Sequence, residues 1–78
     1  MRPNERLAKV FSQVFEKNPA DLTLQTDMDS IDAWDSLGHL NLIMAVEKEF
    51  HVRFPTGQII SLDSVEKIQN ALQKMGAL

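Results

Sequence analysis

The chain has no cysteine. It can therefore form neither a disulfide nor a thiolate zinc site, and nothing in it requires an oxidising compartment. It also lacks any apolar run close to the roughly 20 residues that a membrane-spanning helix needs. Its first ten residues lack the apolar stretch of a signal peptide. We therefore expect a cytoplasmic protein that is not held in a membrane.

Charge and length narrow the class of protein further. The formal net charge of −3 works against a general nucleic-acid role, because like charges repel. Seventy-eight residues leave room for one small domain, spanning residues 1–78, and 44% hydrophobic residues are too many for a disordered chain. We expect a folded monomer with no nucleic-acid partner.

The first regular element is predicted over residues 5–15. Apolar residues recur there with the spacing of one helical face, formed by Leu7, Val10, Phe11, Val14 and Phe15. Asn4 is a suitable cap for its start. Asn18-Pro19 should end it, because the residue before a proline avoids the helical region.

Residues 19–35 form a long connection that is rich in turn-forming aspartate and serine. So long a loop in so small a domain is usually functional, or is packed by its own side chains. Its apolar residues should pin it to the core: Leu22, Leu24, Met28, Ile31 and Trp34. We expect Trp34 to anchor the loop rather than to stack on a ligand.

Three further helical segments follow. The second helix is predicted over residues 36–50, with Leu37, Leu40, Ile43 or Met44, and Val46 or Glu47 on one face. One short turn should cover residues 56–60. The last helix should open at Ser61 or Asp63, turn Val65, Ile68, Leu72 and Met75 inward, and end before Gly76. These segments predict an all-α fold, a four-helix bundle of three main helices and one short helix without a strand.

The tripeptide Asp35-Ser36-Leu37 stands at the predicted start of the second helix. Aspartate and serine are common helix caps, so the tripeptide alone has a purely structural explanation. A serine at this place would nevertheless be exposed and held on a rigid element. The positive end of the helix would also favour a phosphate attached to it.

The segment from Trp34 to Phe50, WDSLGHLNLIMAVEKEF, resembles the motif helix of the acyl carrier protein family. The likeness continues through Phe54-Pro55 into Ser64-Val65, and the order of helices matches over nearly the whole chain. The resemblance implies a carrier protein and not an enzyme. No serine–histidine–aspartate arrangement, phosphate-binding glycine loop or carboxylate pair suggests catalysis either.

The resemblance also implies roles for individual residues. Ser36 would carry a 4′-phosphopantetheine arm, transferred from coenzyme A by a phosphopantetheinyl transferase, and the thiol of the arm would hold acyl or aminoacyl groups as thioesters. Asp35 would help to dock the transferase. Leu37 and Met44 would contact the partner enzymes that load and transfer acyl or aminoacyl groups.

The sequence departs from the fatty-acid members of the family in its charge. Those members are acidic along the motif helix and the short helix after it. Residues 36–60 here carry two acids and two bases, so their formal charge is zero with histidine neutral. Weak electrostatic steering is expected, which favours a specialised stand-alone carrier for a polyketide, a peptide or a related metabolite over a housekeeping fatty-acid carrier.

The acidic stretch 27–35 resembles half of a calcium loop, but its sixth position is Asp32 instead of glycine and its twelfth is Gly38 instead of glutamate. We therefore predict no metal site. His39 is expected at the surface, and it lies about 18 Å of helical rise from His51, too far to share a metal. The alternative function is a helical interaction module that is never pantetheinylated.

Overall fold

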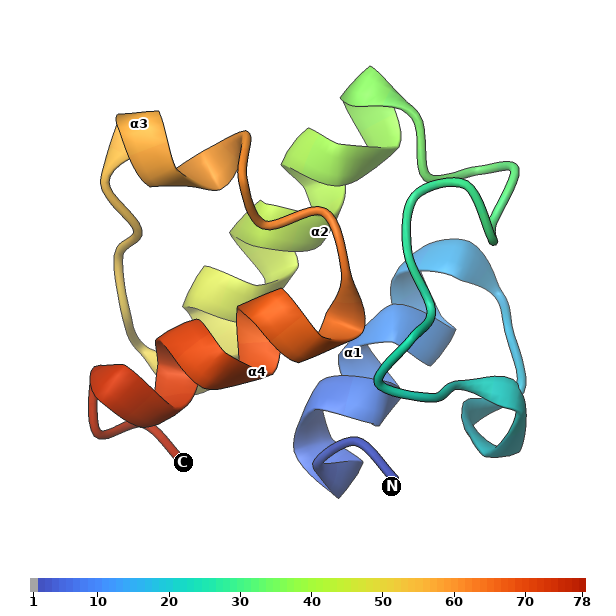
Figure 1. Cartoon of the computed structure of the whole chain (residues 1–78), viewed down its shortest axis with the longest axis horizontal. Coiled ribbons are helices and arrows are strands. Elements are labelled where there is room, and N and C mark those ends of the chain that lie inside the picture. The colour runs from blue at the N-terminus through green and yellow to red at the C-terminus, as the bar shows by residue number, and fades with distance from the viewer. Residues whose placement is uncertain (1) are drawn as a thin grey trace.

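A computed structural model describes residues 2–78, and in this part of the chain four α-helices and one 3₁₀ helix form (Figure 1). The elements are α1 (Glu5–Phe15), η1 (Pro19–Asp21), α2 (Ser36–Phe50), α3 (Thr56–Ile59) and α4 (Val65–Lys74). Residues 2–78 contain no strand, only an isolated bridge between Asp27 and Ser64. The prediction of an all-α bundle with one short helix is confirmed. No helix in the described chain is both long and apolar enough to cross a membrane.

The first helix begins and ends at local signals. The Asn4 side chain accepts hydrogen bonds from the backbone amides of Arg6 (2.9 Å) and Leu7 (3.3 Å), which would otherwise lack a partner in the first turn. The helix ends at Phe15, and Glu16 takes a left-handed conformation with φ 54°. The predicted helix and its cap are confirmed.

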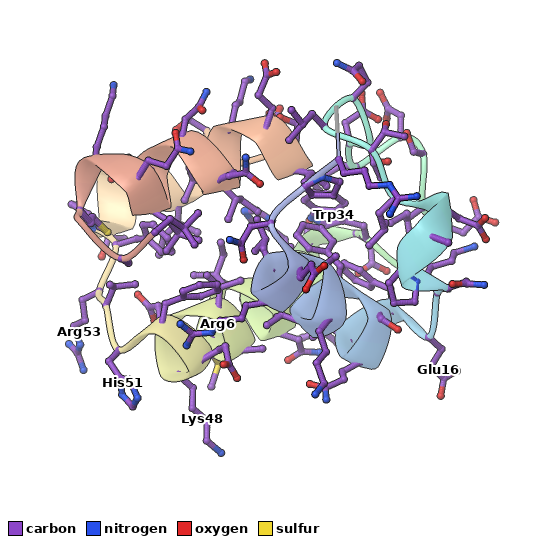
Figure 2. All side chains as sticks on the ribbon, turned by 90° about the horizontal axis from the view of Figure 1, so that it is seen from below. Arg6, Glu16, Trp34, Lys48, His51 and Arg53 are labelled. Carbon is purple, nitrogen blue, oxygen red and sulfur yellow. The ribbon has the colours of Figure 1, made fainter. Side chains whose placement is uncertain are left out.

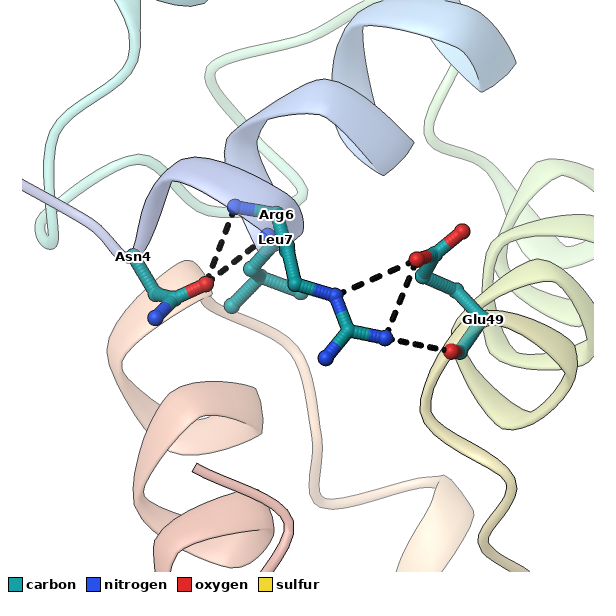
Figure 3. A network of polar contacts seen from close by, with 4 residues as sticks. All are labelled: Asn4, Arg6, Leu7 and Glu49. Atoms are coloured by element: carbon teal, nitrogen blue, oxygen red, sulfur yellow. Dashed lines mark hydrogen bonds and ion pairs between the residues drawn. The ribbon is translucent and has the colours of Figure 1, made fainter.

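The start of α1 is tied to the end of α2 by Arg6 (Figure 3). Its guanidinium donates to the Glu49 carboxylate at 3.1 and 3.2 Å and to the Glu49 backbone carbonyl at 2.7 Å. It also lies 4.6 Å from the centre of the Phe50 ring. The contact satisfies a carbonyl in the last turn of α2 and places a cation at the negative end of that helix.

The long loop between α1 and α2 is packed onto the bundle as predicted. Leu22, Leu24, Ile31 and Trp34 are buried, and Met28 is partly buried against the core. Backbone hydrogen bonds also join the loop to the start of α4, from Met28 to the Asp63 carbonyl (3.1 Å) and from Val65 to the Thr26 carbonyl (2.9 Å). The loop is therefore held from both sides.

The residues predicted to share one face of α2 divide between a buried face and an exposed one. The buried residues of this helix are His39, Leu42, Ile43, Val46 and Phe50. Of the residues predicted to share one face, Leu37, Leu40 and Met44 are exposed, whereas Ile43 and Val46 are buried. The reason is that α2 carries apolar residues on two sides, so that two helical registers fit the same pattern.

The last helix begins one residue later than the latest predicted opening. Ser64, and not Ser61 or Asp63, caps it by accepting a hydrogen bond from the Lys67 amide at 3.2 Å. Met75 was predicted to face inward but is 39% exposed, because it lies in the turn after the helix. Gly76 follows with φ +75°, and bonds from residues 76 and 77 to the last-turn carbonyls close the end of the helix.

Candidate functional site

The candidate site lies where the long loop enters α2. Ser36 is the first residue of the helix and is exposed. The residue that caps the helix is Asp35, whose carboxylate accepts a hydrogen bond from the Gly38 amide at 2.8 Å. The structural explanation of Asp35-Ser36 as a cap therefore applies to the aspartate, and the serine hydroxyl is not used for this purpose.

Gly38 allows the loop to approach the first turn of α2 very closely. A Cβ at this position would lie against the Ala33 carbonyl oxygen, well inside contact distance, and 3.3 Å from the Asp35 carboxylate. A glycine in a helix lowers its stability relative to alanine. The close approach of the loop explains why glycine is nevertheless present here. The missing side chain makes room for the backbone of the loop.

Trp34 joins the loop to both neighbouring helices. Its indole is buried, 5.2 Å from the Phe11 ring in an edge-on arrangement and 5.6 Å from the Phe15 ring in a stacked one (ring centroids). Its Nε1 donates a hydrogen bond to His39 Nδ1 at 2.9 Å. Figure 2 shows the indole inside the molecule, whereas Glu16, Lys48 and Arg53 point outward. The predicted anchoring role of Trp34 is confirmed.

His39 was predicted at the surface, and this prediction is wrong. Only 7% of the residue is exposed, and its Nε2 lies 2.7 Å from the Ile59 carbonyl oxygen in α3. It occupies the buried face of α2 with Leu42 and Ile43. A polar residue in a row of apolar ones gave little sign of burial, and only its spacing from those two residues could have indicated it.

The outward face of α2 is apolar from its first turn. Leu37, Leu40 and Met44, which we call the α2 stripe, are 69%, 53% and 67% exposed. They are spaced by three and four residues, so they lie on one side of the helix. Ile60, directly after α3, is 83% exposed. Sequence reasoning singled out Leu37 and Met44 for partner contact but missed Leu40 and Ile60.

The acidic part of the loop is organised by its own hydrogen bonds. One carboxylate oxygen of Asp27 accepts from the Asp29 amide, the Ser30 amide and the Ser30 hydroxyl at 3.0–3.1 Å. Within residues 2–78, no group of three or more metal-ligating side chains is arranged to hold a metal ion. The acidic loop is therefore accounted for by turn chemistry.

Comparison with protein families gives one match. The model for the phosphopantetheine attachment site matches residues 5–72, which span α1, α2, α3 and most of α4. The chain belongs to this family. A comparison with curated proteins found no significant match. The predicted relation to acyl carrier proteins is confirmed, and with it a covalently attached 4′-phosphopantetheine as the cofactor.

Membership in the carrier family defines the chain's function at a coarse level. Carrier domains hold their cargo for other enzymes and are not themselves catalysts. They interact with a phosphopantetheinyl transferase and with acyl-handling enzymes. The chain is therefore a phosphopantetheine-dependent carrier.

The surroundings of Ser36 fit a phosphate-linked arm. The residue is exposed at the N-terminus of a helix of 15 residues, where unpaired amides and the helix dipole favour negative charge. Both sequence neighbours are exposed as well. An arm attached there would extend into solvent, within reach of a partner.

A groove near the N-terminus of the carrier domain lies away from this site. A groove of about 570 Å³ runs between the start of α1 and η1, and its lining includes Pro3, Ala8, Pro19 and Leu22. None of the predicted site residues lines it.

Replacing Gly38 by alanine should destabilise the carrier domain. The new Cβ meets a backbone carbonyl that can move only with the loop, and such overpacking typically costs about 1–3 kcal/mol of unfolding free energy. The matched control is Gly57→Ala, because a Cβ in α3 at this position meets nothing within 4 Å. Urea unfolding measures both variants. Equal stability of the two would contradict the close approach of Ala33 to Gly38.

Proposed function

We propose that Ser36 is the residue that carries the 4′-phosphopantetheine arm. The observation that supports this most strongly is the division of roles at the start of α2, where Asp35 caps the helix and the Ser36 hydroxyl stays exposed. A serine kept only as a cap would accept the bond that Asp35 accepts. The exposed hydroxyl is thus available to a transferase.

The arm supplies a thiol, which the cysteine-free chain itself lacks. The contribution of the chain's own residues is positional. Ser36 holds the attachment oxygen on a rigid helix, and the helix N-terminus stabilises the negative charge of the phosphodiester. Activation of the hydroxyl belongs to the transferase, so a base beside Ser36 is not required.

Partner enzymes are proposed to dock on the α2 stripe beside Ser36. Met44 and Leu37 are each more than 65% exposed, an unusual state for large apolar side chains on one helix face. Leu40 lies between them and extends the same surface. Asp35, exposed at the helix start, adds one negative charge next to the attachment site and would help to orient the transferase.

The charge of this surface favours a specialised pathway. The segment from Ser36 to Ile60 has equal numbers of acids and bases, and none of the four α3 residues is charged. A partner that recognises carriers through a basic patch would gain little here. We propose cargo from polyketide, peptide or related specialised biosynthesis in preference to housekeeping fatty-acid synthesis.

Ser36→Ala should abolish loading and leave the fold intact. Since Asp35 supplies the cap, the loss of an exposed hydroxyl should change the unfolding free energy by no more than about 0.5 kcal/mol. Intact-protein mass after incubation with coenzyme A, magnesium and a broad-specificity transferase should rise by one phosphopantetheinyl group in the wild type only.

Ser61→Ala is the matched control for loading, since Ser61 is also exposed and lies outside α2. It should load like the wild type. If folded wild-type protein gained no mass with several transferases, the interaction module without an arm would become the better explanation. If Ser36→Ala still gained the arm, the attachment site would lie elsewhere.

Met44→Gln should weaken docking without affecting the helix, because glutamine and methionine have similar helix propensities. Loss of apolar contact area should raise the KM of the transferase for the carrier by about three- to ten-fold and leave kcat nearly unchanged. Met75→Gln, at the end of α4, is the control and should leave KM unchanged. Equal changes in KM for the two variants would show that Met44 is not part of the docking surface.

Enzymes with a basic docking patch should use this carrier poorly. Their kcat/KM at low salt should be at least about ten-fold below that for an acidic housekeeping carrier, because steering is absent. Asn41→Glu, an exposed position on α2, should recover part of the difference, and Asn41→Gln should not. Comparable rates for the two wild-type carriers would contradict the specialised pathway.

A further inference from the structure

His39 is the buried polar residue of the bundle that the carrier function, as described so far, does not use. It lies on α2, one turn from Ser36, and its two ring nitrogens contact two other parts of the chain. Nδ1 meets Trp34 of the long loop, and Nε2 meets the carbonyl of Ile59 at the end of α3. One imidazole thus connects three segments.

The partners of the ring determine its protonation state. The Trp34 indole N–H can only donate, so Nδ1 must be the acceptor and carries no proton. The Ile59 carbonyl can only accept, so Nε2 must carry the proton. Both bonds exist together only in the neutral imidazole with its proton on Nε2. A second proton, on Nδ1, would face the indole N–H and break that contact.

Apart from the His39 hydrogen bond, few contacts attach α3 to the bundle. None of the four α3 residues is buried, the helix has no side-chain cap, and four residues are too few for a helix to be stable alone. The segment is anchored before α3 by the buried Phe54 and after it by the buried Leu62. Between these anchors, Ile59 packs only partly on the core. The hydrogen bond from His39 is thus a main polar link of α3 to the bundle.

The surroundings of the ring include a helix terminus, two aromatic rings and a carboxylate. The positive end of α2 lies next to it, and Phe11 and Phe15 of α1 approach from the side of Trp34. The carboxylate belongs to Asp63, in the turn before α4. This carboxylate accepts a hydrogen bond from the Lys67 ammonium at 2.8 Å, which is the main cause of the lowered pKa of Asp63.

Two further groups complete the surroundings of the ring. The Asp35 carboxylate accepts a hydrogen bond from the Gly38 amide, and α3 itself has no charged residue. In the described chain, no carboxylate hydrogen-bonds to the imidazole of His39.

We infer that neutral His39 is a positioning residue that locks α3 and the long loop onto the first turn of α2, and that protonation of its ring releases this lock. The lock is intact while the imidazole is neutral and is lost as the ring gains a proton on acidification. Release would displace α3 and the exposed Ile60 that directly follows it. Any effect of this displacement on partner docking rests on the proposed function, in which partners dock beside Ser36.

A titration of the protein without its arm tests the inference. Trp34 is the only tryptophan of the chain, so its indole N–H gives a single NMR signal. As the pH is lowered stepwise over the range in which the protein stays folded, this signal should shift when the ring gains a proton. In the same range, the Leu62 amide, which bonds to the Ile59 carbonyl, should lose about ten-fold of its protection against hydrogen exchange. Far-UV circular dichroism follows the overall fold.

Two variants separate the two bonds. His39→Asn places a carbonyl oxygen near Nδ1 and should keep the Trp34 contact while losing the protection of Leu62 at every pH. His39→Gln places an amide N–H near the position of Nε2. It should keep the protection of Leu62 and lose the Trp34 contact. Neither should show the transition. His51→Asn, which keeps a residue suited to the left-handed conformation at that position, should titrate like the wild type.

The inference is overturned if the wild type shows no transition while it remains folded, or if the transition persists in both His39 variants. These outcomes are independent of Ser36, because the arm is not attached. A failure of Ser36 to load would remove the proposed attachment site and leave the titration unchanged. A missing titration would remove the His39 lock and leave loading unchanged.

Discussion

Burial of the Trp34 indole is the interaction on which the rest of this structure depends. A loop of some twenty residues has to be fixed to a small bundle, and its conformational entropy opposes this. The indole contributes a large apolar surface against Phe11 and Phe15 and satisfies its one donor at His39. The end of the loop, and therefore the start of α2, is determined by this contact.

The first turn of α2 divides its tasks among neighbouring residues. Asp35 caps the helix, and Gly38 leaves space for the Ala33 carbonyl. Ser36, between them, has neither task and points to solvent on a backbone that its neighbours hold in place. This arrangement suits a site of modification, because the reacting hydroxyl can be exposed without loss of order around it.

Helix α2 is apolar on two sides, and the two sides have different roles. One side, with Leu42, Ile43 and Val46, forms part of the core, and the other presents Leu37 and Met44 to solvent. Exposed apolar side chains gain free energy only when a partner covers them. With little net charge along this face, recognition would depend on shape and apolar area more than on long-range attraction.

The sequence by itself determined the helices, the cap of α1, the anchoring of the loop and the family, because these follow from local spacing, from residue type and from a continuous motif. The inward face of α2, the burial of His39 and the need for Gly38 were decided only by the tertiary structure. Two registers of α2 satisfy the same apolar pattern. Only the docking of the loop, through Trp34 on His39 and Ala33 on Gly38, selects one of them, since these contacts join segments whose relative placement no local pattern specifies.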